Sequence, residues 1–201
     1  MSNSMTVVEE LAAHGFVSSE RHAEYIFGIR NQPTSWNDAA RRCTYAIIQH
    51  SFKTWDRVSD LREYIDYLID EMGPESKKQI SGNVAAEYWA IFGSTAAAAG
   101  EKLGYFEDLD RVAPLLINQI SDILVSKQRD YGHQNIARFG RAGLLVRCHD
   151  KVARLENLLG AGKTPLNETV VDNFIDVIGY SAIGIMWEKG WFLLPLEPAA
   201  N

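Results

Sequence analysis

The chain has 201 residues, of which 46% are hydrophobic and 23% charged, and its formal net charge is −6 at pH 7. This composition is that of an ordinary soluble protein and excludes a disordered chain. The length allows one domain, or one domain with a large extension, to bury a core without disulfides. The negative charge argues against nucleic acid as the main partner, although it leaves a free nucleotide open.

The cysteines and the hydropathy pattern predict the cellular compartment of the protein. Cys43 and Cys148 are the only two cysteines and have no metal-ligand spacing, which is typical of core thiols in a reducing compartment. The first residues lack the pattern of a secretory signal, and no uninterrupted apolar run is long enough to cross a bilayer. We therefore expect a cytoplasmic protein that has no membrane partner.

Helical periodicity dominates the first half of the chain. The expected elements are a short amphipathic turn or helix at residues 6–13 and helices at 20–29, from 34 or 35 to 48, 56–72 and 84–99. Gly73 and Pro74 end the fourth of these, and the polar residues 75–83 are expected to form a loop. This half shows no catalytic motif, so its tyrosines and tryptophans are predicted to fill the core or an interface. Glu87 and Glu101 are kept as additional candidate acids.

The second half continues the helical pattern without any strand-like alternation or internal repeat. A long helix is predicted at residues 109–129, a polar turn at 130–135, a helix at 141–159, a link at 160–165 and a helix at 167–186. The side chains of the first of these that are expected to face inward are Val112, Leu115, Leu116, Ile120, Ile123 and Leu124. The predicted fold class is therefore all-α, a helical bundle.

The last predicted helix is apolar around most of its circumference but carries one polar stripe. Its members are Glu168, Asp172, Asp176 and Tyr180, at steps of four residues, which place them on one side of a helix. Like charges at this spacing repel each other, and more strongly in a cleft where water is scarce, so a cation must compensate. Two interpretations stay open: a metal site, or structural ion pairs with a neighbouring helix.

The preceding helix carries cations on one face. Its charged side chains are Arg147, Asp150, Lys151 and Arg154, and they lie opposite an apolar stripe. A short link makes two helices antiparallel neighbours, so this face is expected to meet the acidic stripe. Carboxylates would bind Mg²⁺ and the cations would bind phosphate, which is the combination that a triphosphate needs. A salt-bridge zipper would need the same residues, and the spacing does not decide between the two.

Four separated blocks of the chain resemble a known family. They are residues 127–132 (KQRDYG), Phe139-Gly140 with Gly143-Leu144, residues 147–155 (RCHDKVARL) and residues 167–180 (NETVVDNFIDVIGY). In this order they resemble the phage and bacterial family called nucleotide modification associated domain 1. We therefore divide the chain into residues 1–105, a helical region without an assigned role, residues 106–195, the resembling domain, and a tail at 196–201.

This family is similar in turn to the all-α nucleoside triphosphate pyrophosphohydrolases of the MazG and dCTPase type. The resemblance implies a MazG-like four-helix core in the C-terminal half and a Mg²⁺-dependent enzyme that releases pyrophosphate from a nucleotide, most simply a dNTP. The implied metal ligands are Glu168, Asp172 and Asp176, and the implied catalytic acids are these three and Asp150. The implied phosphate and substrate contacts are Arg147, Lys151, Arg154, Tyr131, Asn135 and Tyr180. Relatives of this type assemble as dimers or tetramers, which implies a homo-oligomer by analogy.

The sequence also departs from these enzymes in one respect. They carry an E-x-x-E pattern on the helix before the acidic one, and the helix at 141–159 lacks it. This implies fewer metal ions, or binding without hydrolysis. Two other functions therefore stay open: a non-catalytic nucleotide-binding module that assists DNA or nucleotide modification, and a helical phage protein that binds a host protein through its first half.

Overall fold

The computed structural model describes residues 32–49, 55–160 and 167–199, and these residues form helices and loops without a strand. The helices are α3 (Trp36–Gln49), α4 (Val58–Met72), α5 (Gly82–Lys102), α6 (Leu109–Tyr131), α7 (Gln134–Ala137), α8 (Gly140–Gly160) and α9 (Val170–Glu188). The prediction of an all-α fold is confirmed. The helices predicted at residues 6–13 and 20–29 lie outside the described residues.

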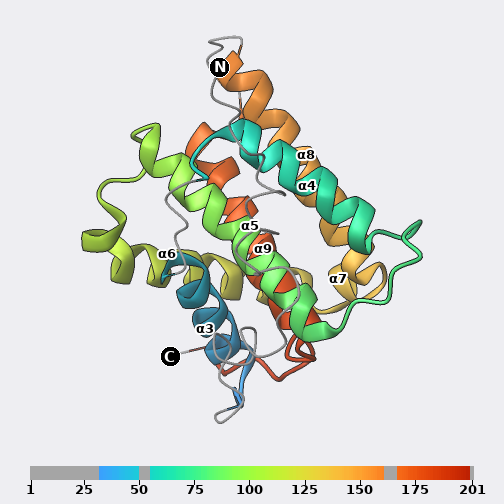
Figure 1. Cartoon of the computed structure of the whole chain (residues 1–201). Helices are drawn as coiled ribbons and strands as arrows, with labels where there is room; N and C mark the ends of the chain where they lie inside the picture. The colour runs from blue at the N-terminus through green and yellow to red at the C-terminus, as the bar shows by residue number, and fades with distance from the viewer. Residues whose placement is uncertain (1–31, 50–54, 161–166, 200–201) are drawn as a thin grey trace.

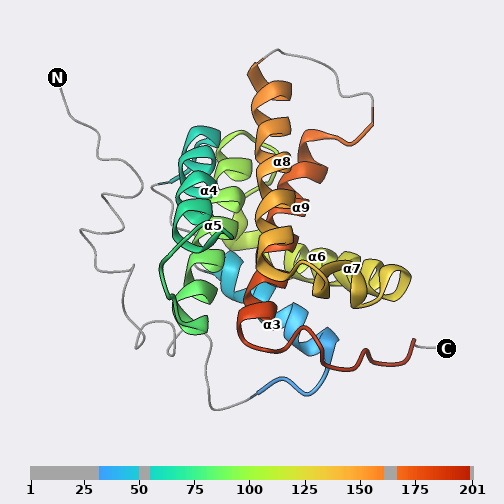
Figure 2. The same cartoon turned by 90° about the vertical axis from the view of Figure 1, so that its right-hand side faces the viewer.

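Two helices form the centre of the bundle. α5 and α9 pack along each other more extensively than any other described pair (Figure 1). α3 packs against both of them and against α6, whereas α4 packs against α5 and α8. α8 runs beside α9, and α6 crosses the direction of these two helices (Figure 2). One hydrophobic core therefore contains side chains from both sides of the predicted boundary after residue 105.

The close approach of α5 and α9 depends on small residues. A Cβ atom added to Gly184 of α9 would lie 2.6 Å from Cγ and 2.7 Å from Cε2 of Trp89 in α5. A Cβ atom added to Gly93 of α5 would lie 2.8 Å from the Cβ of Ser181 in α9. Both distances are shorter than van der Waals contact, so the glycines let the two backbones come together around the buried indole.

α9 is the described helix that is long and apolar enough to cross a membrane by length and composition. However, 67% of its most apolar stretch is buried inside the bundle. The other helices of the bundle therefore cover most of the apolar surface of α9.

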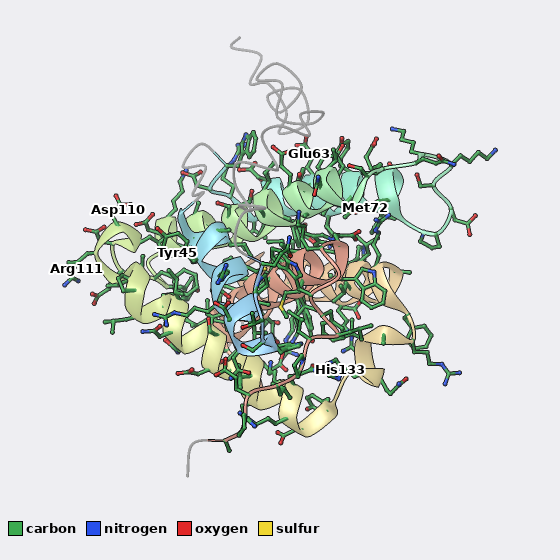
Figure 3. All side chains as sticks on the ribbon, turned by 90° about the horizontal axis from the view of Figure 1, so that it is seen from below. Tyr45, Glu63, Met72, Asp110, Arg111 and His133 are labelled. Atoms are coloured by element: carbon green, nitrogen blue, oxygen red, sulfur yellow. The ribbon has the colours of Figure 1, made fainter. Side chains whose placement is uncertain are left out.

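α6 buries the predicted side of the helix, with Leu115 as the exception. Its buried side chains include Ala113, Leu116, Ile120 and Leu124, at steps of three or four residues. Leu115 was expected among them, but 72% of it is exposed, because its position falls on the opposite side of the helix from this stripe. Figure 3 shows α6 from below, with Asp110 and Arg111 at its outer end and His133 beyond its other end.

Local hydrogen bonds fix several helix ends. The carboxylate of Glu101, at the end of α5, accepts a hydrogen bond from the backbone N–H of Leu109 at 2.7 Å, which begins α6. Glu197, in the predicted tail, donates its backbone N–H to Asn37 of α3 at 3.2 Å, and its carbonyl oxygen accepts from Arg129 of α6 at 2.7 Å. Glu101 therefore stabilises a helix start, and the described part of the tail is held against the bundle.

The buried carboxyl of Glu87 in α5 predicts a pH dependence of stability. Burial raises its pKa from 4.5 to about 8. Between these pH values the folded protein keeps a proton that the unfolded chain releases, so the free energy of unfolding should fall as the pH rises from about 5 to about 8. Urea unfolding across this range should show the slope, and Glu87→Gln should flatten it. Glu75→Gln, at an exposed position, should leave it unchanged, and a slope that persists in Glu87→Gln would contradict the assignment.

Candidate functional site

A pocket of about 420 Å³ opens among α3, α6, α7, α8 and α9. Its volume lies within the range of ligand sites, about 300–1,000 Å³. The polar and charged side chains that line it are Lys127, Gln128, Tyr131, Asn135, Arg147, Lys151, Glu168, Asp176 and Tyr180. Seven of the ten predicted site residues are among them, and the other three, Asp150, Arg154 and Asp172, do not line the pocket.

Asp176 is bound by two lysines. Lys127 Nζ donates to its Oδ1 at 2.8 Å, and Lys151 Nζ lies 2.7 Å from its Oδ2. Lys151 Nζ also donates to Glu168 Oε2 at 2.6 Å, so one ammonium group joins the two carboxylates. Burial lowers the pKa of Lys151, but the hydrogen bonds to Asp176 and Glu168 outweigh this effect and raise the pKa above its ordinary value. Lys151 is therefore charged at neutral pH.

The three predicted site residues that do not line the pocket lie elsewhere on α8 and at the start of α9. Arg154 Nη1 lies 3.2 Å from Glu168 Oε2, at the edge of the charged cluster that Lys127, Lys151, Glu168 and Asp176 form. Asp150 is exposed on α8. Asp172 Oδ2 accepts hydrogen bonds from the backbone N–H and the hydroxyl of Thr169, at 2.8 and 2.7 Å, and these bonds hold the pKa of Asp172 below its usual value.

The first two residues of the predicted acidic stripe differ from the prediction: Glu168 lies outside the helix, and Asp172 caps its start. Thr169 is the N-cap of α9 and Asp172 is the third residue of the helix, so the two side chains form a capping box. Glu168 precedes the helix and reaches the pocket from the loop. The sequence pattern of a polar stripe and that of a helix cap share the residue Asp172, and the cap uses it here.

The three carboxylates predicted as Mg²⁺ ligands have different contacts in the structure. Asp172 faces the start of α9, whereas Asp176 and Glu168 meet at Lys151. Across residues 32–49, 55–160 and 167–199, no three His, Cys, Asp or Glu side chains are close enough together to hold a metal ion. In the structure, Lys127, Lys151 and Arg154 pair with Asp176 and Glu168, and these two carboxylates converge on Lys151.

Arg147 differs from the other cations of the pocket because no described carboxylate pairs with it. Its Nη2 donates to Asn135 Oδ1 at 2.9 Å, and its guanidinium carbon lies 5.9 Å from the centre of the Tyr180 ring. These contacts orient the guanidinium but leave its charge uncompensated. A guanidinium has five N–H donors, so most of them remain available to an anionic ligand.

The pocket has an open charged rim and a buried end. The side chains of Lys127 and Glu168 are 48% and 44% exposed. In contrast, Gln128 is only 6% exposed and Trp36 is fully buried. Lys127 lies in a block that carries the family resemblance, so its motif could have identified it. Gln128 lies in the same block at a position that the motif leaves open, and Trp36 lies outside the four blocks, so the place of both in the pocket depends on tertiary packing.

No protein-family model, curated protein or solved structure matches this chain. The resemblance to the nucleotide modification associated domain 1 family therefore stays a prediction from the four residue blocks.

The capping box gives a prediction that separates a structural role of Asp172 from metal binding. Asp172→Ala and Thr169→Ala should each lower the free energy of unfolding by about 1 kcal/mol, because each removes one half of the box. Both variants should bind ligand as well as the unchanged protein does. Denaturant unfolding and ligand titration check this. A variant at Asp172 that unfolds normally but loses ligand or Mg²⁺ binding would show that this carboxylate belongs to the site.

Proposed function

We propose that the pocket binds a nucleotide-like ligand, an aromatic base that carries phosphate groups. The observation that supports this most strongly is the oriented and uncompensated guanidinium of Arg147. Arginine binds phosphate through charge-assisted hydrogen bonds, which are about twice as strong as neutral ones. Two lysines, Lys127 and Lys151, lie in the same lining, so three cations face two carboxylates and the lining keeps an excess positive charge.

Aromatic side chains supply the second half of this argument. Tyr131 lines the pocket with 64% of its surface exposed, and Tyr180 lies beneath Arg147. Aromatic rings next to cations suit a ligand that has both a flat ring and a charged group. The volume of about 420 Å³ suits a small molecule of this kind.

Hydrolysis is the second candidate function. Asp176 and Glu168 lie 2.7 and 2.6 Å from the same Lys151 Nζ, so two carboxylates converge on one point of the pocket. Mg²⁺ takes one or two protein carboxylates together with phosphate oxygens and water. These two acids are therefore the ones that would hold a Mg²⁺ ion brought in by the nucleotide, and the ion would polarise a phosphate as a Lewis acid.

A nucleotide panel with and without Mg²⁺ tests both candidates. Calorimetric titration should show that at least one nucleoside triphosphate binds, and that part of the affinity persists without Mg²⁺ because Arg147 needs no metal. Release of pyrophosphate in the presence of Mg²⁺ would support the pyrophosphohydrolase, and binding without turnover would support the non-catalytic module. No binding across the panel, modified bases included, would overturn the proposal.

The remaining expectations are proposals about the setting of this activity. We propose a cytoplasmic location, which fits the two buried free thiols Cys43 and Cys148. We also propose a homo-oligomer, a dimer or tetramer by analogy, which sedimentation analysis would test. Binding of a host protein through residues 1–105 would be supported if Asp176 variants lost stability without any effect of a nucleotide.

A further inference from the structure

We infer that Gln128 selects the base of the ligand, and that the pocket favours bases that present a keto oxygen over bases that present an amino group. This inference rests on the proposed nucleotide binding and adds the class of base. It starts from a buried polar side chain whose hydrogen-bond donor has no partner among the described residues.

Gln128 lies on α6 at the buried end of the pocket and is 6% exposed. Its Nε2 is buried and finds no hydrogen-bond partner among the residues that the structure describes. Buried donors are almost always paired, because an unpaired one loses its bonds to water without replacement. A ligand that brings an acceptor to this point would supply the missing partner.

Trp36 adds a second donor to the same wall. Its indole Nε1 is also buried without a partner in the described part of the chain, and its side chain lines the pocket from α3. An indole N–H can donate but cannot accept. In the orientation that the structure shows, Gln128 Nε2 and the indole N–H are both donors, so the buried end has a surplus of donors. A surplus of donors favours a ligand edge made of acceptors.

The exposure of the lining decides which part of the ligand reaches Gln128. Lys127, its neighbour in the chain, is 48% exposed, whereas Gln128 is 6% exposed. Phosphate groups are strongly hydrated and suit the open rim with its cations. The flat base suits the buried end, where Ile183 and Ile136 are also part of the lining.

The nucleobases differ at an exocyclic group that a donor can read. Uracil and thymine carry an oxygen acceptor at the ring position where cytosine carries an amino donor, and guanine and adenine differ in the same way. Matched pairs of nucleotides hold the ring size and the phosphate groups constant, and the variants at Gln128 then assign the difference in affinity to this residue.

The experiment is calorimetric titration of the full chain with dUTP, dCTP, dGTP, dATP and inorganic triphosphate. We expect dUTP to bind about tenfold or more tightly than dCTP, and dGTP than dATP, because the amino group leaves the Gln128 donor unpaired. Gln128→Leu should bring each ratio close to one and leave the affinity for inorganic triphosphate unchanged. Gln134→Leu, at an exposed position outside the pocket lining, is the matched control and should keep the ratios.

Gln128→Glu makes the test independent of any loss of stability in the leucine variant. A carboxylate accepts hydrogen bonds and donates none when ionised. Within this single variant the preference should reverse toward dCTP and dATP, even if the total affinity falls. Equal ratios in the unchanged protein, or ratios that survive Gln128→Leu, would overturn the inference while nucleotide binding stands. Failure of all five compounds to bind would instead remove the proposed function.

Discussion

Arg147→Met should weaken nucleoside triphosphate binding by about 10- to 100-fold and leave the free energy of unfolding nearly unchanged. Hydrogen bonds to a charged group contribute about 1.5–3 kcal/mol, which corresponds to this range of affinity. The methionine keeps the apolar stem that packs near Tyr180. Stability should change little because no described carboxylate is left without a partner when this guanidinium is removed. Titration calorimetry and denaturant unfolding of the same preparation measure both quantities.

Arg138→Met is the matched control for this change. Arg138 also lies over an aromatic ring, with its guanidinium carbon 5.8 Å from the centre of Phe139, but it does not line the candidate pocket. Both variants therefore remove one positive charge and one contact between a cation and a ring. Equal effects of the two on binding would mean that only the overall charge matters. An Arg147 variant with normal affinity would contradict the role of this residue in the proposed site.

The charged cluster shows how far sequence periodicity reaches. The offsets of Arg147, Lys151 and Arg154 placed them on one face of a helix, and a short link placed that face against Glu168 and Asp176. The structure brings Lys151 into contact with both acids, as the two-helix argument predicted. Periodicity and loop length were sufficient here because both helices are long and neighbours in the chain.

The same reasoning failed where two local patterns share a residue. Asp172 continues a four-residue stripe, but it also stands three residues after Thr169, which is the spacing of a capping box. The cap satisfies backbone N–H groups that would otherwise lack partners at the start of α9, and the helix therefore begins after Thr169, which leaves Glu168 outside it. A stripe has no comparable local stabilisation, so the cap decides the conformation.

The buried end of the pocket depends on contacts between segments far apart in the sequence. Trp36 comes from α3 and reaches a pocket that is otherwise formed by α6 to α9 and the segment before α9. The sequence showed that Trp36 belonged to an apolar helix face, but not against which helices that face would pack. Gln128 lies between the charged residues Lys127 and Arg129 in the block 127–132, and nothing in that block predicts its burial. Its burial follows from the crossing of α6 over the central helices, which no local pattern determines.

Gly184→Ala should destabilise the protein strongly. The added methyl group would lie 2.6 Å from Cγ of the buried Trp89, at the closest approach of α5 and α9. Overpacking of a dense core costs about 1–3 kcal/mol, and this position has little room to relax because the indole is surrounded on all sides. Gly160→Ala is the matched control, since its added Cβ would meet nothing within 4 Å. It should leave stability unchanged or raise it slightly by restricting the unfolded chain.

A variant of Trp89 tests whether the clash with the indole, and not the loss of the glycine itself, causes the loss of stability in Gly184→Ala. Trp89→Leu alone should cost about 2–4 kcal/mol because it leaves a cavity between the two central helices. In the double variant Gly184→Ala with Trp89→Leu, the methyl group would occupy part of that cavity. The two costs should therefore not add, and a double-mutant cycle measured by denaturant unfolding should give a favourable coupling of about 1 kcal/mol or more. Strict additivity would mean that the indole and the glycine are not in contact, and the packing of α9 against α5, which holds Asp176 and Tyr180 toward the pocket, would need another explanation.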